Sequence, residues 1–254
     1  MYDIEMREAS PEFARCWKAA GLHIQGQVQG PLNSWLKVNL NPPFLEHLSF
    51  RLGNQLFFIR IEDAGGELEV PGSRQGLRSI ADGCNGHACL MPMRREGAEW
   101  IADGPGWGFL DLRTGRAIDP IALITDDLIE MTDWELHDFA VQIVKDHLAK
   151  QGRTLMSWQG NPSVDPSIWF VGDHGPEWVV VRAARYPETS VEPPANWRAI
   201  AENCSKLGKS GHFASVGFAN SDDAFDPSGA VPATPLWRGH GMLVRFIGLT
   251  PGPS

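Results

Sequence analysis

The feature that most constrains the fold of this chain is an internal repeat. Its 254 residues divide into two halves in which the same elements are predicted in the same order. Each half shows a helix, three extended segments, a second helix and two further extended segments. A repeat of this length indicates that one supersecondary unit is present twice, so the sequence predicts a tandem duplication.

The second half has the clearest signals. Thr132 can cap a helix, and Glu135 three residues later completes a capping box. Apolar residues then recur at helical spacing until Gly152, which is expected to end the helix. Extended runs are predicted at 154–158, 167–171 and 178–182, followed by a helix over 194–204 and strands over 213–218 and 242–246.

The first half repeats this order. Its first helix is predicted to begin at Ser10-Pro11, a cap followed by proline at the first helical position, and to end at Gly21. Extended runs are predicted at 35–40, 48–52 and 56–61, followed by a helix over 73–84 and strands over 89–93 and 108–112.

Residue identities follow the order of elements. The second helices read RSIADGC (78–84) and RAIAENC (198–204), and a Gly-His pair follows each of them, at His87 and at His212. The third extended segment of each half ends in an arginine, Arg60 or Arg182. Matches in the same order on the same elements favour duplication over chance.

Two further matches extend the alignment towards both ends. Ser34-Trp35 matches Ser157-Trp158, and residues 106–110 (GWGFL) match residues 239–243 (GHGML). Drifting offsets between the matches indicate loop insertions, the largest at 220–235. The predicted boundaries are a first repeat at 1–118, a linker at 119–131 and a second repeat at 132–254.

The predicted fold class is α+β. Apolar runs such as Phe57–Ile59 and Val179–Val181 are typical of central strands that are covered on both faces. We expect each repeat to form a mixed sheet flanked by helices, and the two repeats to pack as an intramolecular pseudo-dimer. Because a duplicated chain already contains the interface of a homodimer, we expect a monomer or a weak dimer.

Composition excludes some classes of function. A formal net charge of −9 argues against broad, non-specific binding of nucleic acid, because the average surface repels phosphate. No run approaches the roughly 18 apolar residues that span a bilayer, so no membrane association is expected. Four cysteines are too few for a disulfide framework, which favours a reducing, cytoplasmic location.

Two acidic residues could bind a metal ion in the second repeat. Asp165 opens the second extended segment, Glu177 opens the third, and Glu135 lies on the preceding helix. This arrangement resembles the PD-(D/E)XK restriction-endonuclease-like superfamily. The resemblance implies a site in which Asp165 and Glu177 bind Mg²⁺ or Mn²⁺ and Glu135 supplies an additional acid.

The sequence departs from that superfamily. Val179 stands where the resemblance requires a lysine, so an active site would have to borrow a cation such as Arg182. The first repeat aligns non-acidic residues, near Phe44 and Gln55, with the two acids. The alternative is that Asp165 caps a turn and that Glu177 is an exposed hairpin residue.

Cysteine and histidine provide two further candidate sites. Cys84, His87 and Cys89 are spaced as zinc ligands could be, although the alternative is a buried cysteine beside a histidine bonded to the backbone. His87 and His212 could instead line two related clefts, one in each repeat.

Two classes of function remain open. The first is a non-enzymatic binding or interaction scaffold built from the duplicated unit. The second is a metal-dependent phosphodiesterase or nuclease-like protein, active or degenerate, centred on Asp165 and Glu177.

Overall fold

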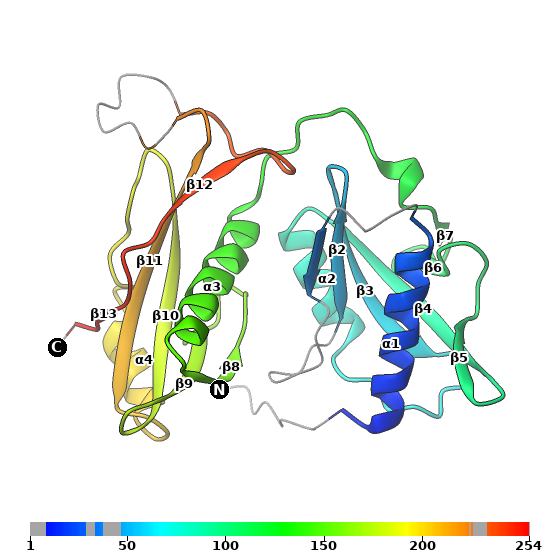
Figure 1. Ribbon diagram of the computed structural model, residues 1–254, viewed down its shortest axis with the longest axis horizontal. Coiled ribbons are helices and arrows are strands. Elements are labelled where there is room, and N and C mark those ends of the chain that lie inside the picture. The colour runs from blue at the N-terminus through cyan, green and yellow to red at the C-terminus, as the bar shows by residue number, and fades with distance from the viewer. Residues whose placement is uncertain (1–8, 29–33, 38–46, 224, 226–232, 254) are drawn as a thin grey trace. The chain divides into compact units, whose positions relative to one another are not determined.

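The computed structural model describes residues 9–28, 34–37, 47–223, 225 and 233–253. Contacts between residues divide the chain into two compact units, Met1–Leu128 (unit 1) and Ile129–Ser254 (unit 2) (Figure 1). Each unit has a mixed sheet with helices, so the predicted α+β class is confirmed.

Unit 1 is built on a mixed sheet in the order β1-β2-β3-β4-β6-β7, with β5 also paired to β4. In it β3 and β4 run parallel, and the other pairs are antiparallel. Its elements are α1 (Pro11–Gly26), β1 (Ser34–Lys37), β2 (Leu48–Leu52), β3 (Gln55–Asp63), α2 (Arg74–Gly83), β4 (His87–Glu96), β5 (Glu99–Ala102), β6 (Phe109–Asp111), β7 (Ala117–Ile118) and the 3₁₀ turn η1 (Ile121–Leu123).

Unit 2 is built on a sheet in the order β12-β11-β10-β9-β8, with β13 also paired to β11. Here β10 and β11 are the parallel pair. Its elements are α3 (Asp133–Lys150), β8 (Thr154–Trp158), β9 (Ile168–Gly172), β10 (Gly175–Arg185), α4 (Trp197–Cys204), β11 (Ser210–Asn220), β12 (Met242–Arg245) and β13 (Thr250–Pro251).

The strand registers of the two units coincide, which fits a duplication. Equivalent residues face one another across four strands of each sheet. In unit 1 this row is Trp35, Phe50, Phe57 and His87, and in unit 2 it is Trp158, Ile168, Val179 and His212. The predicted matches Trp35/Trp158 and His87/His212 therefore occupy the same positions in both ladders.

The last predicted match does not hold in the ladders. Leu110 pairs with Leu90 near the start of β4, whereas Leu243 pairs with Ala219 at the end of β11. By register, β12 corresponds to β5 and β13 to β6. The reason is an insertion: β4 and β5 are joined by a tight turn, but residues 221–241 separate β11 from β12.

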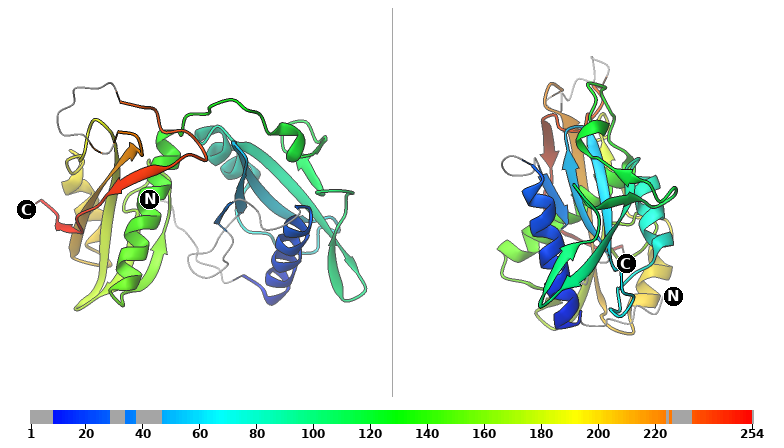
Figure 2. Two further views of the ribbon diagram at one scale, coloured as in Figure 1. Left: turned by 45° about the horizontal axis from the view of Figure 1, so that its top comes forward. Right: turned by 90° about the vertical axis from the view of Figure 1, so that its right-hand side faces the viewer.

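Helices pack on both faces of each sheet because alternate side chains of a strand point to opposite faces. In β10, Val179 and Val181 pack in one core with α3, whereas Trp178 and Val180 pack in another with α4. Figure 2 shows α3 and α4 on the two sides of this sheet. In unit 1, α1 packs against Phe57 and its neighbours of the same parity.

The first helix runs beyond its predicted end. α1 continues through Gly21 to Gly26, and Ile24 beyond Gly21 is fully buried. Gly21 lies within the helix, and no atom lies within 4 Å of a Cβ placed there, so neither its conformation nor its surroundings require glycine. The apolar stripe therefore overrides the glycine as a helix stop.

The Gly-His pairs have a packing reason. A Cβ at Gly86 would lie 2.8 Å from the ring of Phe58, and one at Gly211 would overlap the ring of Trp178. Each glycine lies near the start of its strand, β4 or β11, and packs against a ring on the neighbouring parallel strand, β3 or β10. A residue with a Cβ at this position would force a neighbouring side chain or the strand to shift in either unit, which favours glycine.

The segment predicted as a linker (119–131) is divided between the two units. Ile124 lies against Gly53, and the Asn54 side chain donates to the carbonyl of Asp127 at 2.8 Å. The backbone N–H of Met131 instead donates to Leu236 in unit 2 at 2.8 Å. The packing of the two units as a pseudo-dimer stays a prediction.

Candidate functional site

The two histidines that begin β4 and β11 make equivalent contacts. His212 Nε2 lies 2.6 Å from Glu177 Oε2, and His87 Nε2 lies 3.0 Å from Gln55 Oε1. Gln55 and Glu177 occupy the same register position, two residues before the partner of the histidine. The structure thus places the same side-chain contact across the parallel strands of each unit, neutral in unit 1 and acidic in unit 2.

Glu177 is not the exposed hairpin residue that the alternative interpretation expected. Its side chain is only 16% exposed and crosses Gly172 of the neighbouring strand. Arg153 lies nearby, and its pKa is raised mainly by Asp173 and to a lesser degree by Glu177. Glu177 therefore belongs to a charged cluster near the starts of the parallel strands β10 and β11, where His212 lies.

Asp165 lies elsewhere. Its carboxylate accepts two hydrogen bonds from Arg182, at 2.9 and 2.6 Å, and both side chains are mostly buried. Arg182 has the strand parity of Trp178, which packs with α4, whereas Glu177 has the opposite parity. Five residues of strand, about 16 Å, also separate them.

The structure consequently does not bring Asp165 and Glu177 together as the predicted pair of metal ligands. Side chains alternate between the two faces along β10. Arg182, which binds Asp165, and Glu177 therefore point to opposite faces of the sheet. Phe44, the expected counterpart of Asp165 in the first repeat, lies outside the described residues.

Glu135 is engaged in a buried ion pair. Its carboxylate accepts two hydrogen bonds from Arg238, both at 2.9 Å, and the two side chains are 6% and 1% exposed. It also completes the predicted capping box with Thr132. Glu135 therefore fastens the inserted segment 221–241 to the start of α3.

Arg60 has a similar fastening role in unit 1. Its guanidinium donates to Glu62 at 3.0 Å and to the carbonyl oxygens of Val70 and Pro71. Arg74 also binds Glu62 and, with burial opposing it, lowers the pKa of that carboxyl. Arg60 and Arg182 are equivalent in register, and each is bonded to residues of its own unit.

The proposed zinc ligands are not assembled. Cys84 caps α2, Cys89 is buried in the core beneath α1, and the His87 ring is bonded to Gln55. Burial raises the pKa of Cys89 to about 12, which opposes the thiolate that zinc requires. Within the described residues, no group of three or more His, Cys, Asp or Glu is placed to hold a metal ion.

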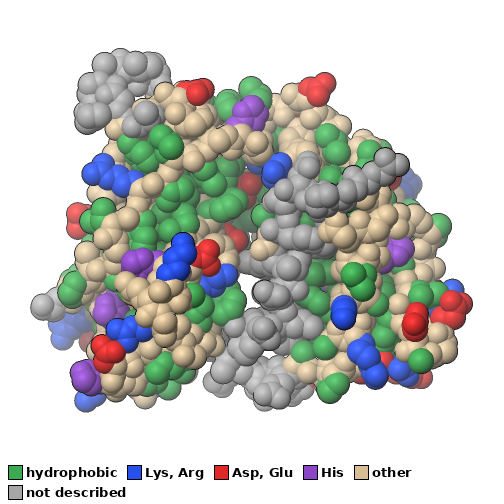
Figure 3. Space-filling model, in the orientation of Figure 1, with side chains coloured by type: hydrophobic (Ala, Val, Ile, Leu, Met, Phe, Trp, Pro, Cys, Tyr) green, Lys and Arg blue, Asp and Glu red, His purple; other side chains and the backbone are tan. Residues whose placement is uncertain are grey.

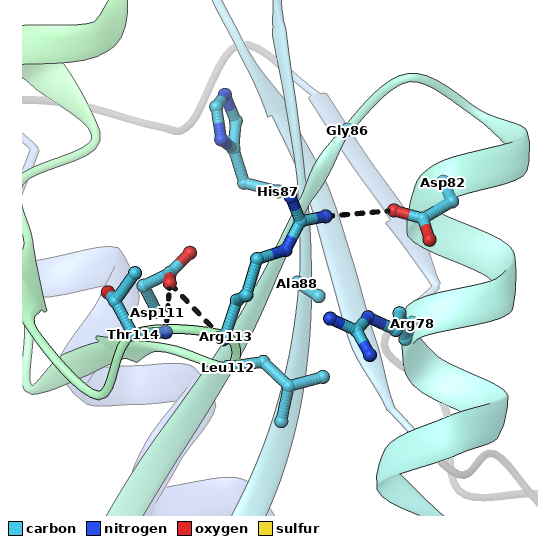
Figure 4. Close-up of a pocket in the computed structure, with 9 residues that line it drawn as sticks. All are labelled: Arg78, Asp82, Gly86, His87, Ala88, Asp111, Leu112, Arg113 and Thr114. Carbon is cyan, nitrogen blue, oxygen red and sulfur yellow. Dashed lines mark hydrogen bonds and ion pairs between the residues drawn. The ribbon is translucent and has the colours of Figure 1, made fainter.

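An open pocket of about 280 Å³ lies in unit 1 between α2, the start of β4 and the β6–β7 hairpin. Figure 4 shows Arg78 from α2 and Arg113 from the hairpin extending into it from its two sides, and the His87 ring directed away. Asp82 lies 3.6 Å from Arg113. The lining residues are Arg78, Asp82, Gly86, His87, Ala88, Asp111, Leu112, Arg113 and Thr114.

Asp111 shapes the wall of this pocket. Its carboxylate accepts hydrogen bonds from the backbone N–H groups of Arg113 and Thr114, at 3.2 and 2.6 Å. The hydrogen bond from the Thr114 side chain is the main cause that lowers the pKa of Asp111; the two backbone bonds and the Arg113 charge lower it further, and burial opposes them. The Asp111 carboxylate therefore stabilises the hairpin turn, and the turn positions the backbone of Arg113.

Sequence reasoning did not single out Arg78 and Arg113 as a site. In the sequence, Arg78 stands out only as the match of Arg198, and Arg113 belongs to a short polar turn. Because one lies on a helix and the other in a distant turn, no local pattern links them.

The comparisons with known proteins bear on unit 2. A family model described as a domain of unknown function (DUF8840) matches residues 134–251. This range runs from α3 to β13, so the match covers the complete sheet of unit 2. No curated protein and no solved structure matches the chain.

No helix in the described ranges has the length and apolar character needed to cross a membrane. On the face drawn in Figure 3, basic side chains are interspersed with acidic ones among the described residues, without an extensive basic area.

Proposed function

We propose that the protein is a non-enzymatic binding scaffold built from a duplicated α+β unit. The observation that carries this proposal is that Asp165, Glu177 and Glu135 are each bonded to a different cationic or imidazole partner within unit 2. A divalent cation needs carboxylate oxygens that converge on one point. These three residues instead stabilise three separate parts of the fold.

The contact shared by the two units supports the same proposal. Gln55 makes with His87 the contact that Glu177 makes with His212. Because an amide suffices in unit 1, the common role of this position is a hydrogen bond that joins the starts of two parallel strands. A general base would require the carboxylate.

The resemblance to the PD-(D/E)XK superfamily stays a prediction. The order of elements in unit 2 is compatible with it, as is the mixed sheet. The positions of the acids favour a degenerate member over an active phosphodiesterase.

A double-mutant cycle on Asp165 and Arg182 tests the structural role of the acid. We expect Asp165→Asn and Arg182→Gln each to lower the free energy of unfolding of unit 2 by about 1–3 kcal/mol, because each leaves a mostly buried charge without its partner. The double variant should lose less than the sum of the two, since both changes remove one interaction. Urea unfolding followed by circular dichroism measures all three.

A hydrolysis assay provides the opposing measurement. With Mg²⁺ or Mn²⁺ present, the wild-type chain should not cleave plasmid DNA or a small phosphodiester above background. Metal-dependent cleavage that is lost in both Asp165→Asn and Glu177→Gln would overturn the scaffold proposal.

A further inference from the structure

The pocket of unit 1 contains an arginine whose charge is not neutralised. The Arg78 guanidinium is exposed on α2 and makes no hydrogen bond or ion pair with any residue that the structure describes. Arg113, opposite it, lies 3.6 Å from Asp82, which is longer than a hydrogen bond, and its charge also acts on the Asp111 carboxylate. Two guanidinium groups therefore border one cavity (Figure 4), in which the Asp82 carboxylate is loosely held and the Asp111 carboxylate is bonded to the backbone of the turn.

Unit 2 shows that this arrangement is specific to unit 1. Arg198, the counterpart of Arg78, donates to Glu202 one helical turn away at 3.2 Å. Asp82 replaces that glutamate in unit 1, and it contacts Arg113 instead. The shorter acid and the added hairpin cation together leave Arg78 unpaired.

The hairpin itself has no described counterpart in unit 2. β6 continues through a turn into β7, and the turn carries Arg113. In unit 2, β13 is followed by Gly252, on which the Trp197 ring of α4 packs. After its last described strand, unit 2 thus has a contact between Trp197 and Gly252 where unit 1 has the turn of the hairpin.

We propose that this pocket is an anion-binding site in which Arg78 and Arg113 hold the carboxylate or phosphate group of a small ligand. Guanidinium groups bind such oxyanions through charge-assisted, often bidentate hydrogen bonds. The side chains of Ala88 and Leu112 add an apolar surface for the remainder of the ligand. The inference deepens the binding role proposed above and rests on it.

The chemistry of the pocket fits an oxyanion that carries a compact apolar group. Benzoate and phenyl phosphate share the ring and differ in the anionic head, so they distinguish the two sources of negative charge. Asp82 is expected to turn from Arg113 towards solvent when the anion binds, because both compete for one guanidinium.

The test is a titration of the full chain with each probe, followed by ¹H–¹⁵N NMR. Saturable shifts are expected at the backbone amides of Ala88, Leu112 and Thr114. Arg78→Gln should weaken binding about tenfold, the effect of losing a charge-assisted contact. Because Arg78 is exposed, the rest of the spectrum should be unchanged.

Two matched variants control for general charge effects. Arg198→Gln changes the equivalent residue of unit 2, and Arg116→Gln removes a cation from the same hairpin outside the pocket. Both should bind the probes as the wild type does. Equal weakening in Arg78→Gln and either control would overturn the site, as would the absence of saturable shifts in the pocket for both probes.

The two proposals fail separately. Cleavage that depends on Asp165 ends the scaffold proposal without affecting the anion titration. Binding that is unchanged by Arg78→Gln ends the anion site and leaves the scaffold proposal standing.

Discussion

Glu135 shows how an acidic residue that looks catalytic in the sequence can be structural. It follows a cap by three residues, as a capping-box glutamate does, and it also lies on the helix where the superfamily resemblance expects an acid. The structure assigns it to the cap and to Arg238. Local pattern predicted the first of these contacts, whereas the second joins residues more than a hundred positions apart.

Glu135→Gln should destabilise unit 2 by about 3 kcal/mol, because it removes the negative charge of Glu135 from the buried Arg238 guanidinium. The matched control is Asp133→Asn in the same helical turn. The Asp133 side chain is 93% exposed, and its ion pair with Arg185 should contribute less than about 1 kcal/mol. Urea unfolding compares the two, and equal losses would contradict the buried-pair interpretation.

Exposed pairs of charges are the part of the candidate site that sequence could not predict. Asp82 and Arg113 belong to different elements, and nothing in the local pattern of either indicates a partner. Buried apolar residues alternate with strand or helix period, so they leave a signal in the sequence. A polar pocket formed by a helix and a distant hairpin leaves none.

At the scale of elements, the sequence was informative where signals are local. The four helices and most strands were predicted, because apolar period and glycine placement are recognised within short windows, whereas the short strands β5, β7 and β13 were not predicted. The correspondence of β5 with β12 was not, because it depends on which part of β11 each strand pairs with. Residues 221–241 are inserted before β12, and the match between residues 106–110 and 239–243 therefore indicated a different pairing.

The Gly-His pairs yield a prediction that involves both units. Gly211→Ala should force the ring of Trp178 or the strand to move, and Gly86→Ala should do the same at Phe58. We expect each to cost about 1–3 kcal/mol by overpacking, in the unit that contains it.

Gly21→Ala is the matched control for these two substitutions. It lies within α1, where an added Cβ meets nothing within 4 Å, so it should stabilise unit 1 by about 0.5–1 kcal/mol. Thermal and urea unfolding of the three variants provide the comparison. A Gly211→Ala variant as stable as the wild type would show that steric exclusion does not explain the repeated glycine.

At the scale of the whole molecule, the division between the units lies within the segment that sequence predicted as a linker. Residues before the boundary contact the β2–β3 turn, through Ile124 and Asp127. Residues after it contact the inserted segment, through Ile129 and Met131. Proline and acidic composition is typical of a linker, yet the backbone on each side of the division is bonded to the unit that it belongs to.

Two fragments of unit 2 test where it begins. The fragment 129–254 should unfold cooperatively in urea, because the backbone bonds of Ile129 and Met131 to Arg238 and Leu236 lie within it. The fragment 132–254, which starts at the boundary predicted from sequence, lacks those bonds and the buried Met131 side chain. It should therefore be less stable by about 2 kcal/mol. Equal midpoints of unfolding would show that residues 129–131 contribute nothing to the stability of unit 2 and that a boundary at residue 132 is adequate.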